Sequence, residues 1–176
     1  MGLPGVLRVG AWYHFDDFAH QRTAEPLGND YGVYGVIDQL VYRLPGREYK
    51  GIGIFGRLAA SPSDRNLMDL YVDAGVKVSG MVPHRPDDSF GAAFAYGRIS
   101  DEASAADIDA GLAVVRSYET LLELNYAAQI VPGWIVISDF QYIWNPGGDV
   151  ALDDDDPSSP EVEDAAVLGV RTVLNY

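Results

Sequence analysis

Glu119 and Glu123 are the two side chains of this sequence whose types and closeness most readily suggest acid–base chemistry. A carboxylic acid and a carboxylate that flank a glycosidic bond can hydrolyse it when they lie about 5 to 9.5 Å apart. The residues around this pair alternate in polarity, which indicates a strand, and four strand residues at about 3.3 Å each separate the two side chains by roughly 13 Å. This spacing argues against catalysis and favours two charges on one polar surface.

Metal-binding chemistry has little support. The run Asp153 to Asp156 offers the carboxylate oxygens that calcium prefers, but it lacks the glycine turn and terminal glutamate of a twelve-residue calcium loop. We interpret it as a solvated acidic loop and leave calcium binding open. His14, His20 and His84 are scattered without a second ligand at metal spacing, so the sequence predicts no zinc site.

The sequence contains no nucleotide-binding or nucleophile motif that points to a class of enzyme. The letters GIGIFG at residues 51–56 match GxGxxG, but a dinucleotide loop must open a helix and this stretch reads as the inside of a strand. The nucleophile elbow GxSxG does not occur. The sequence therefore predicts neither an enzyme nor a cofactor.

The composition limits the partners. The 176 residues include 12 Lys plus Arg and 26 Asp plus Glu, a formal net charge of -14 that disfavours nucleic acid and anionic membrane surfaces. There is no cysteine, and no stretch approaches eighteen consecutive apolar residues. A closed barrel, however, crosses a membrane with strands that need only alternating hydrophobicity. The start MGLPGVLRVGAWY does not read as a signal peptide, so we expect a chain that stays inside the cell or lacks its true beginning.

Alternating hydrophobicity is clearest in residues 118–130, YETLLELNYAAQI, where Leu122, Leu124 and Tyr126 fall on one side and Glu119 and Glu123 on the other. Successive side chains of a strand point to opposite faces, so this segment is predicted to be a strand with one oily face. Glycine and proline divide the rest of the chain into similar segments. The predicted strands cover residues 6–15, 31–44, 51–59, 67–81, 90–99, 117–130, 134–145 and 165–176.

The connections between these segments alternate in length. Residues 45–50, 82–89 and 131–133 are short, whereas residues 16–30, 60–66, 100–116 and 146–164 are mostly longer. A short helix is expected within residues 100–115, with Ser100 or Asp101 as its cap. Short turns at one end and long loops at the other are typical of outer-membrane barrels.

Aromatic residues suggest which medium the oily faces meet. Trp134 and Trp144 stand at the two ends of one face of residues 134–145, as in the aromatic belts at membrane interfaces. Tyr13, Phe15, Tyr118, Tyr126 and Tyr176 extend the pattern. We favour a membrane barrel, and a soluble β-sandwich or a small lipocalin-like barrel remains the alternative.

One strand fits this picture less well. In strict alternation Asp38 and Arg43 lie on opposite faces of residues 31–44. A charge at the middle of the bilayer is costly, and the cost falls towards the interface. We expect Asp38 to face a lumen and Arg43 to lie at the interface, unless a bulge changes the alternation.

Three stretches carry a resemblance to a known family. They are GVYGVIDQLVYR, GRLAASPSDRNLMDLYVDAGVKVSG and YETLLELNYAAQIVPGWIVISDFQYIWNPGG, followed by the terminus VLGVRTVLNY. From about Gly10 to Tyr176 the chain resembles the carbohydrate-selective porins of the OprB family. The resemblance implies an all-β, antiparallel, up-and-down transmembrane barrel of sixteen strands, of which residues 1–176 form a single domain of about eight strands. This domain looks like the C-terminal half, without the signal peptide and the N-terminal half.

The resemblance also implies a function and partners. These are passive diffusion of sugars such as glucose, a lipid bilayer of the outer membrane, an assembly machinery that reads Tyr176, and either a separate N-terminal half or a second copy of the chain. The residues expected to line the pore are Arg8, Trp12, Arg57, Asp69, Asp73, Lys77, Glu119, Glu123, Asp139, Gln141 and Arg171.

The alternative is a closed eight-stranded barrel with a structural or binding role and no channel. Small barrels fill their interior with side chains. The expected inner face of residues 90–99 carries only Gly91, Ala93, Ala95 and Gly97, which leaves the interior nearly bare. The closed barrel is therefore the second choice.

Overall fold

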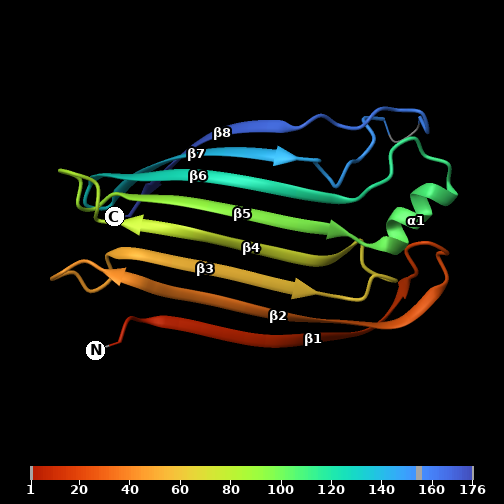
Figure 1. The fold of residues 1–176 in the computed structure, drawn as a ribbon, viewed down its shortest axis with the longest axis horizontal. Coiled ribbons are helices and arrows are strands. Elements are labelled where there is room, and N and C mark those ends of the chain that lie inside the picture. The colour runs from red at the N-terminus through yellow and green to blue at the C-terminus, as the bar shows by residue number, and fades with distance from the viewer. Residues whose placement is uncertain (1, 154–155, 176) are drawn as a thin grey trace.

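A single antiparallel sheet makes up most of the protein in a computed structural model that describes residues 2–153 and 156–175 (Figure 1). Each strand pairs with the next one in the chain, in the order β1 to β8. The elements are β1 (Gly5–Ala19), β2 (Pro26–Arg43), β3 (Gly51–Ala60), β4 (Met68–Ser79), β5 (Ser89–Ile99), α1 (Asp101–Asp109), β6 (Tyr118–Val131), β7 (Trp134–Trp144) and β8 (Ala165–Leu174). The predicted eight-stranded meander is confirmed.

The connections separate into two groups at opposite ends of the sheet (Figure 1). Residues 44–50, 80–88 and 132–133 turn the chain at one end, here called the short-turn end. Residues 20–25, 61–67, 100–117 and 145–164 connect strands at the other, the long-loop end. The first of these was predicted to be long and is in fact brief, because β1 and β2 continue their pairing up to Ala19 and Pro26.

The predicted helix is confirmed as α1, which lies in the connection between β5 and β6 at the long-loop end (Figure 1). Ser100 is its N-cap, and its side-chain oxygen accepts a hydrogen bond from the backbone N–H of Ala103 at 3.2 Å. Asp101 and Glu102 place negative charge in the first turn, where the helix dipole favours it. None of the helices in the described chain is long and apolar enough to cross a membrane.

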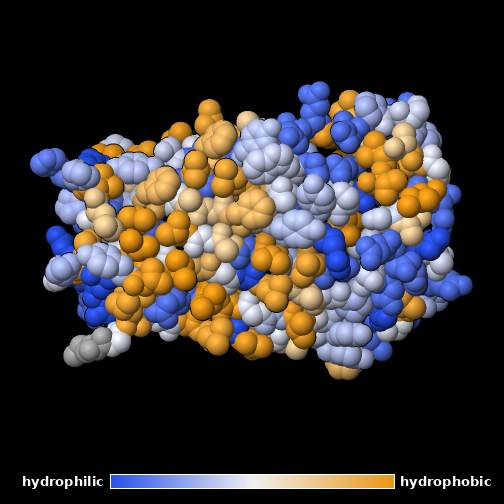
Figure 2. Space-filling model, in the orientation of Figure 1, coloured by the Kyte–Doolittle hydropathy of each residue, from blue (hydrophilic) through white to orange (hydrophobic). Residues whose placement is uncertain are grey.

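The sheet encloses almost no hydrophobic core. Ile99 and Ala103 are the apolar residues that are fully buried within the described chain. By contrast Val9 is 80% exposed and Leu168 is 83% exposed, and Figure 2 shows hydrophobic side chains gathered on the surface over the strands. A soluble sandwich would cover such a face with a second layer. The apolar face of this sheet instead meets something outside the chain.

The two ends of the sheet remain apart. β1 pairs with β2 and β8 pairs with β7, and the strand order does not bring β1 and β8 together. An eight-stranded barrel requires that pairing to close. The closed small barrel is therefore not favoured, and within the described residues each edge strand has one side of its backbone without a strand partner.

A bulge in β2 changes the alternation along this strand. The ladder between β2 and β3 skips Val41, so Tyr42 pairs with Ile52 and Arg43 pairs with Gly51. Asp38 pairs with Phe55, four residues away from Gly51, and Arg43 therefore lies on the same face as Asp38. The bulge therefore puts the two charges of β2 on one face, whereas strict alternation would have put them on opposite faces.

A buried carboxylate fastens the turn between β4 and β5 to β6. The side chain of Asp88 is 1% exposed and accepts hydrogen bonds from Arg85 Nε at 2.7 Å, from the Gln129 backbone N–H at 2.9 Å and from the hydroxyl of Tyr126. The hydrogen bond from Arg85 lowers the pKa of Asp88 from 3.8 to about 2, with further contributions from Tyr126 and Gln129. This end of the sheet therefore depends on an ionised Asp88.

The substitution Asp88→Asn is expected to destabilise the folded chain by about 2 to 3 kcal/mol, because it removes a charged acceptor of three hydrogen bonds. The folded-state pKa is depressed, so the stabilisation is present above about pH 4 and disappears as the pH falls through about 2. Urea unfolding in lipid vesicles at several pH values measures both effects. The matched control is Asp87→Asn, whose carboxylate is half exposed and pairs with Lys50. Equal urea concentrations at the unfolding midpoint for the two variants at pH 7 would contradict the prediction.

Candidate functional site

The ladders divide the side chains between two faces. Arg57 pairs with Asp73, Lys77 pairs with Gly91, and Glu123 pairs with Gln141. Following the ladders from strand to strand places Arg57, Asp73, Lys77, Glu123, Asp139 and Arg171 on one side, which we call the polar face. The opposite side, the apolar face, carries residues such as Leu7, Val72, Phe94, Leu124 and Leu168.

A hollow of about 470 Å³ opens on the polar face over β5. Its floor contains Gly91 and Ala93, because the residues of β5 on this face have almost no side chain. Polar side chains from the neighbouring strands surround this floor. They are Lys77, Glu123, Asn125, Asp139, Gln141 and Arg171.

Glu123 is held in place by two amides. Asn125 Nδ2 donates to Glu123 Oε1 at 2.9 Å, and Gln141 Nε2 donates to Glu123 Oε2 at 3.1 Å. A Cβ atom at Gly91 would lie 2.7 Å from the Asn125 amide oxygen, so the glycine gives Asn125 room to lie over β5. The hollow thus presents fixed oxygen acceptors beside amide and basic donors, an arrangement suited to hydrogen bonding with a polyhydroxyl molecule.

A second polar cluster lies on the same face towards the long-loop end. Asp73, 4% exposed, accepts hydrogen bonds from Arg57 Nε at 2.7 Å and from the Tyr71 hydroxyl at 2.8 Å. The Arg57 side chain is 56% exposed, so the guanidinium reaches open space while it neutralises the buried carboxylate. Arg57 and Asp73, both predicted to line a pore, therefore form one unit.

The remaining predicted residues lie outside the hollow. Arg8 pairs with Val36 on the edge strand β1, and the Trp12 indole covers Gly32 of β2. Glu119 accepts a hydrogen bond from the Gly147 N–H at 2.6 Å and so fixes the start of the connection between β7 and β8. Among the described residues, these three side chains do not line the hollow that holds Glu123, Asn125 and Gln141.

Asp69 is placed differently from the expectation. A bulge between Met68 and Leu70 interrupts the alternation, and the Asp69 carboxylate accepts two hydrogen bonds from Arg98, at 2.8 and 2.9 Å. Arg98 itself pairs with Leu70 and Tyr118, which belong to the apolar face. The sequence argument that put Asp69 on one face with Asp73 assumed unbroken alternation and was wrong at this position.

Asn125 and Arg43 are polar-face residues outside the set of predicted pore-lining candidates. For Asn125 the alternation of residues 118–130 nevertheless predicts that it faces the lumen together with Glu119 and Glu123, and in the structure it lies beside Glu123. Arg43 was expected at the interface unless a bulge changed the alternation, and the structure has that bulge at Val41. The sequence therefore placed the first residue, and for the second it indicated a conflict without locating the bulge that resolves it.

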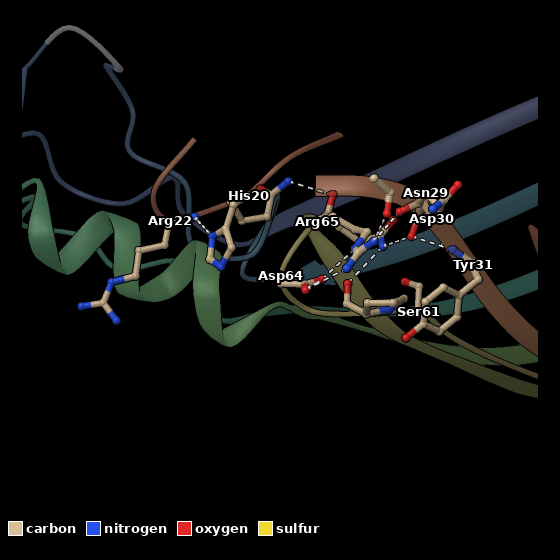
Figure 3. A network of polar contacts seen from close by, with 12 residues as sticks. His20, Arg22, Asn29, Asp30, Tyr31, Ser61, Asp64 and Arg65 are labelled. Atoms are coloured by element: carbon tan, nitrogen blue, oxygen red, sulfur yellow. Dashed lines mark hydrogen bonds and ion pairs between the residues drawn. The ribbon is translucent and has the colours of Figure 1, made fainter. Parts of the chain in front are cut away.

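Polar contacts also join the loops at the long-loop end (Figure 3). Arg65 donates to the carbonyl oxygen of Asn29 and, through Nε, to Asp64 at 2.9 Å, and this second hydrogen bond holds the pKa of Asp64 below its ordinary value. Asn66 Nδ2 donates to the carboxylate of buried Asp30 at 2.9 Å. The connection between β3 and β4 is thereby fastened to the hairpin of β1 and β2.

The histidines and the described part of the acidic run show no metal-binding arrangement. His20 Nδ1 accepts from the backbone N–H of Arg22 at 3.1 Å, which stabilises a turn (Figure 3). Asp156 accepts two hydrogen bonds from Ser158. Residues 154–155 lie outside the described chain, and the rest contains no group of three His, Cys, Asp or Glu side chains that could hold a metal ion.

Aromatic side chains form two bands on the apolar face. At the long-loop end Tyr96 stacks on Tyr118 with ring centroids 5.7 Å apart, and Tyr142 contacts Trp144 edge-to-face at 4.7 Å. Tyr13, Phe15 and Tyr31 continue this band across β1 and β2. At the short-turn end the ladders place Tyr42, Phe90, Tyr126 and Trp134 on the same face. Tyr176, predicted to join the pattern, lies outside the described residues.

A single-layer meander with an apolar, doubly banded face and a polar opposite face defines the wall of a transmembrane β-barrel with an aqueous interior. The family model described as "Carbohydrate-selective porin, OprB family" matches residues 1–176. The chain belongs to this family of porins.

Two relatives show how much of such a porin is present. Porin B of Pseudomonas aeruginosa strain PAO1 is 26% identical over 199 residues, an alignment that covers 96% of this chain and 40% of that protein. A structure described as the high-pH structure of Pseudomonas putida OprB superposes with a TM-score of 0.84 at 21% identity, over 98% of this chain and 45% of that one. The chain spans less than half the length of both relatives.

Removing the partner of Asp73 tests the second polar cluster. We expect Arg57→Leu to lower the free energy of unfolding by about 2 kcal/mol, because the buried carboxylate loses a charged donor and keeps only the Tyr71 hydroxyl. Urea unfolding of the vesicle-bound chain measures the change. The matched control is Arg8→Leu on the same ladder row, joined to Arg57 through Val36. A loss at Arg57 no larger than the loss at Arg8 would show that the ion pair does not stabilise the wall.

Proposed function

We propose that this chain forms the C-terminal eight strands of a sixteen-stranded outer-membrane barrel whose pore admits sugars such as glucose by passive, selective diffusion. The observation that carries the proposal is the hollow over β5, where Glu123, Asn125 and Gln141 present fixed hydrogen-bonding groups beside a floor of Gly91 and Ala93. The family and the two relatives support it. The assembly machinery that recognises Tyr176 is a further part of the proposal.

The charges around the hollow favour a neutral solute. Lys77 and Arg171 are basic, and Glu123 and Asp139 are acidic, so an ion of either sign meets an unfavourable charge nearby. Hydroxyl groups of a sugar can instead donate to the carboxylates and accept from the basic and amide groups. Weak binding by several such groups replaces part of the hydration of the sugar and still lets it leave, which is the condition for permeation.

The other predicted residues have supporting roles in this proposal. Arg57 and Asp73 lie on the polar face between the hollow and the long-loop end. Arg8 and Trp12 lie on the edge strand β1, and Glu119 lies at the long-loop end beside Gly147. Glu119 and Glu123 act as separate polar groups, because Glu119 is engaged by Gly147 and Glu123 by two amides. No catalytic step is assigned to them.

Conductance across a planar lipid bilayer, with the refolded chain and graded glucose, tests the proposed function. We expect conductance steps that decrease as glucose binds in the pore. The variant Ala93→Phe fills the floor of the hollow and should weaken the glucose effect about tenfold, the equivalent of losing one or two hydrogen bonds. The matched control is Ala74→Phe, the same change on the apolar face beside Phe94.

Three results separate the possibilities. A glucose effect that is weakened by Ala93→Phe and retained by Ala74→Phe supports permeation past the hollow. Equal effects of both variants would contradict the assignment of this site. Conductance steps that do not respond to glucose would contradict sugar selectivity.

A further inference from the structure

An aromatic residue lies on the polar face at the border of the hollow over β5. Phe55 stands two residues before Arg57 in β3, so its side chain shares the polar face. Phe55 lines the hollow over β5 and also a second hollow of about 490 Å³, which lies over β2, β3 and β4. Its ring is therefore on the aqueous side of the wall, where contact with lipid does not require an apolar group.

A glycine determines how the ring lies. A Cβ atom at Gly75 would lie 2.5 Å from two atoms of the Phe55 ring, so the ring extends across the bare backbone of β4. Gly75 pairs with Ala93, which belongs to the floor of the hollow over β5. The ring therefore extends from β3 across β4 towards this floor.

The ring and the acceptors of the hollow share one ladder row. From Phe55 the row runs through Gly75 and Ala93 to Glu123 and Gln141. Three strand spacings of about 4.8 Å separate the backbones of Phe55 and Glu123 by roughly 14 Å. The two residues between them in the row are small, so an aromatic ring borders one side of an open floor and a carboxylate held by amides borders the other.

A ring-closed sugar has two kinds of surface that match these two sides. Its hydroxyl groups lie mostly around the edge of the sugar ring, and its C–H groups form two flat apolar faces. The face of an aromatic ring carries partial negative charge and attracts the slightly positive hydrogens of C–H groups. Carboxylate and amide groups form hydrogen bonds with hydroxyls. A solute that has both surfaces is therefore bound from both sides of the floor.

We propose that Phe55 is the apolar contact of the sugar at the hollow over β5 and makes this site select ring-closed sugars over open-chain polyols. The inference rests on the proposed function and deepens it, because it names a feature of the solute beyond its hydroxyl groups. An open-chain polyol offers the same kind of hydroxyls to Glu123 and Gln141. Its flexible chain must be ordered before it presents a flat C–H surface to Phe55, and this ordering costs free energy.

The second hollow gives a stacked sugar a way to move on. Lys77 lines both hollows together with Phe55, and Asp38 and Ser79 line the second one. A sugar that slides along the Phe55 ring exchanges the polar groups of one hollow for those of the other and keeps the aromatic contact. Successive weak sites of this kind suit selective permeation.

Planar-bilayer conductance with glucose and with sorbitol, its open-chain polyol, tests the selection. Phe55→Leu keeps an apolar side chain and removes the aromatic face. We expect it to raise the glucose concentration that gives half of the conductance effect about fivefold, and to leave the corresponding sorbitol concentration unchanged. Phe55→Tyr keeps the aromatic face and should retain the wild-type value for glucose. Equal changes for the two solutes, or wild-type values for both in Phe55→Leu, would overturn the proposal.

The matched control is Tyr34→Leu. The Tyr34 ring also lies across a glycine of a neighbouring strand on the polar face, Gly10, and Tyr34 is not among the described residues that line either hollow. A ring that only covers a glycine should not affect the choice of solute. Tyr34→Leu is therefore expected to leave the ratio of the glucose and sorbitol concentrations unchanged, and a shift of this ratio equal to that of Phe55→Leu would overturn the assignment to Phe55.

Saturation-transfer NMR with the vesicle-bound chain measures the contact without requiring a pore. Irradiation of the aromatic protons should transfer more saturation to the C–H protons of glucose than to those of sorbitol. Phe55→Leu should remove this difference, and Tyr34→Leu should retain it. Equal transfer to the two solutes in the wild-type chain would overturn the proposal, whether or not Phe55→Leu folds.

The two measurements separate this inference from the proposed function. Selective transfer to glucose from a chain whose conductance does not respond to glucose supports the contact with Phe55 and counts against the sugar pore. Glucose-sensitive conductance that Phe55→Leu weakens equally for glucose and sorbitol supports the pore and overturns the contact.

Discussion

Backbone hydrogen bonding between neighbouring strands is the constraint on which the other features of this protein depend. Each strand from β2 to β7 has partners on both sides, and the sheet remains one layer thick. Each strand therefore exposes both of its faces, and burial inside the protein cannot hide its apolar side chains. Of the described apolar residues only Ile99 and Ala103 are fully buried. The alternation of oily and polar residues places the oily ones against lipid and leaves the others to face water.

Charge is organised by the same constraint. The chain has 26 acidic and 12 basic residues, and several of the few basic ones are hydrogen-bonded to buried carboxylates of the strands, turns and helix. Asp73 is paired with Arg57, Asp88 with Arg85 and Asp107 with Arg116. Removing one partner of such a pair is costlier than removing both, because an unpaired buried charge remains. Two amides donate to the carboxylate of Glu123, and Lys77 and Arg171 line the same hollow.

Much of the fold could be predicted from local patterns. The period of two identified all eight strands, Ser100 marked the start of α1, and the aromatic positions Trp134 and Trp144 indicated the two interfaces. Bulges could not be predicted in this way, since one extra residue changes the facing of a strand without changing its composition. For this reason Asp69 was expected on the face of Asp73, and Arg43 was expected at the interface unless a bulge changed the alternation. The lengths of β1 and β2 were also underestimated, because pairing extends past His14 through a register shift.

The sequence by itself determined which side chains share a face within each strand, since that depends only on the period of the extended backbone. It therefore determined that Glu123 and Asn125 lie together and that Gly91 and Ala93 leave their strand bare. Only the tertiary structure decided which strands bring their residues to the same place. Register between strands depends on turns and bulges, and it puts Gln141 beside Glu123 and Lys77 beside Gly91. It also leaves β1 and β8 apart, because each strand pairs with its neighbour in the chain and the order of the described strands contains no pairing between β1 and β8.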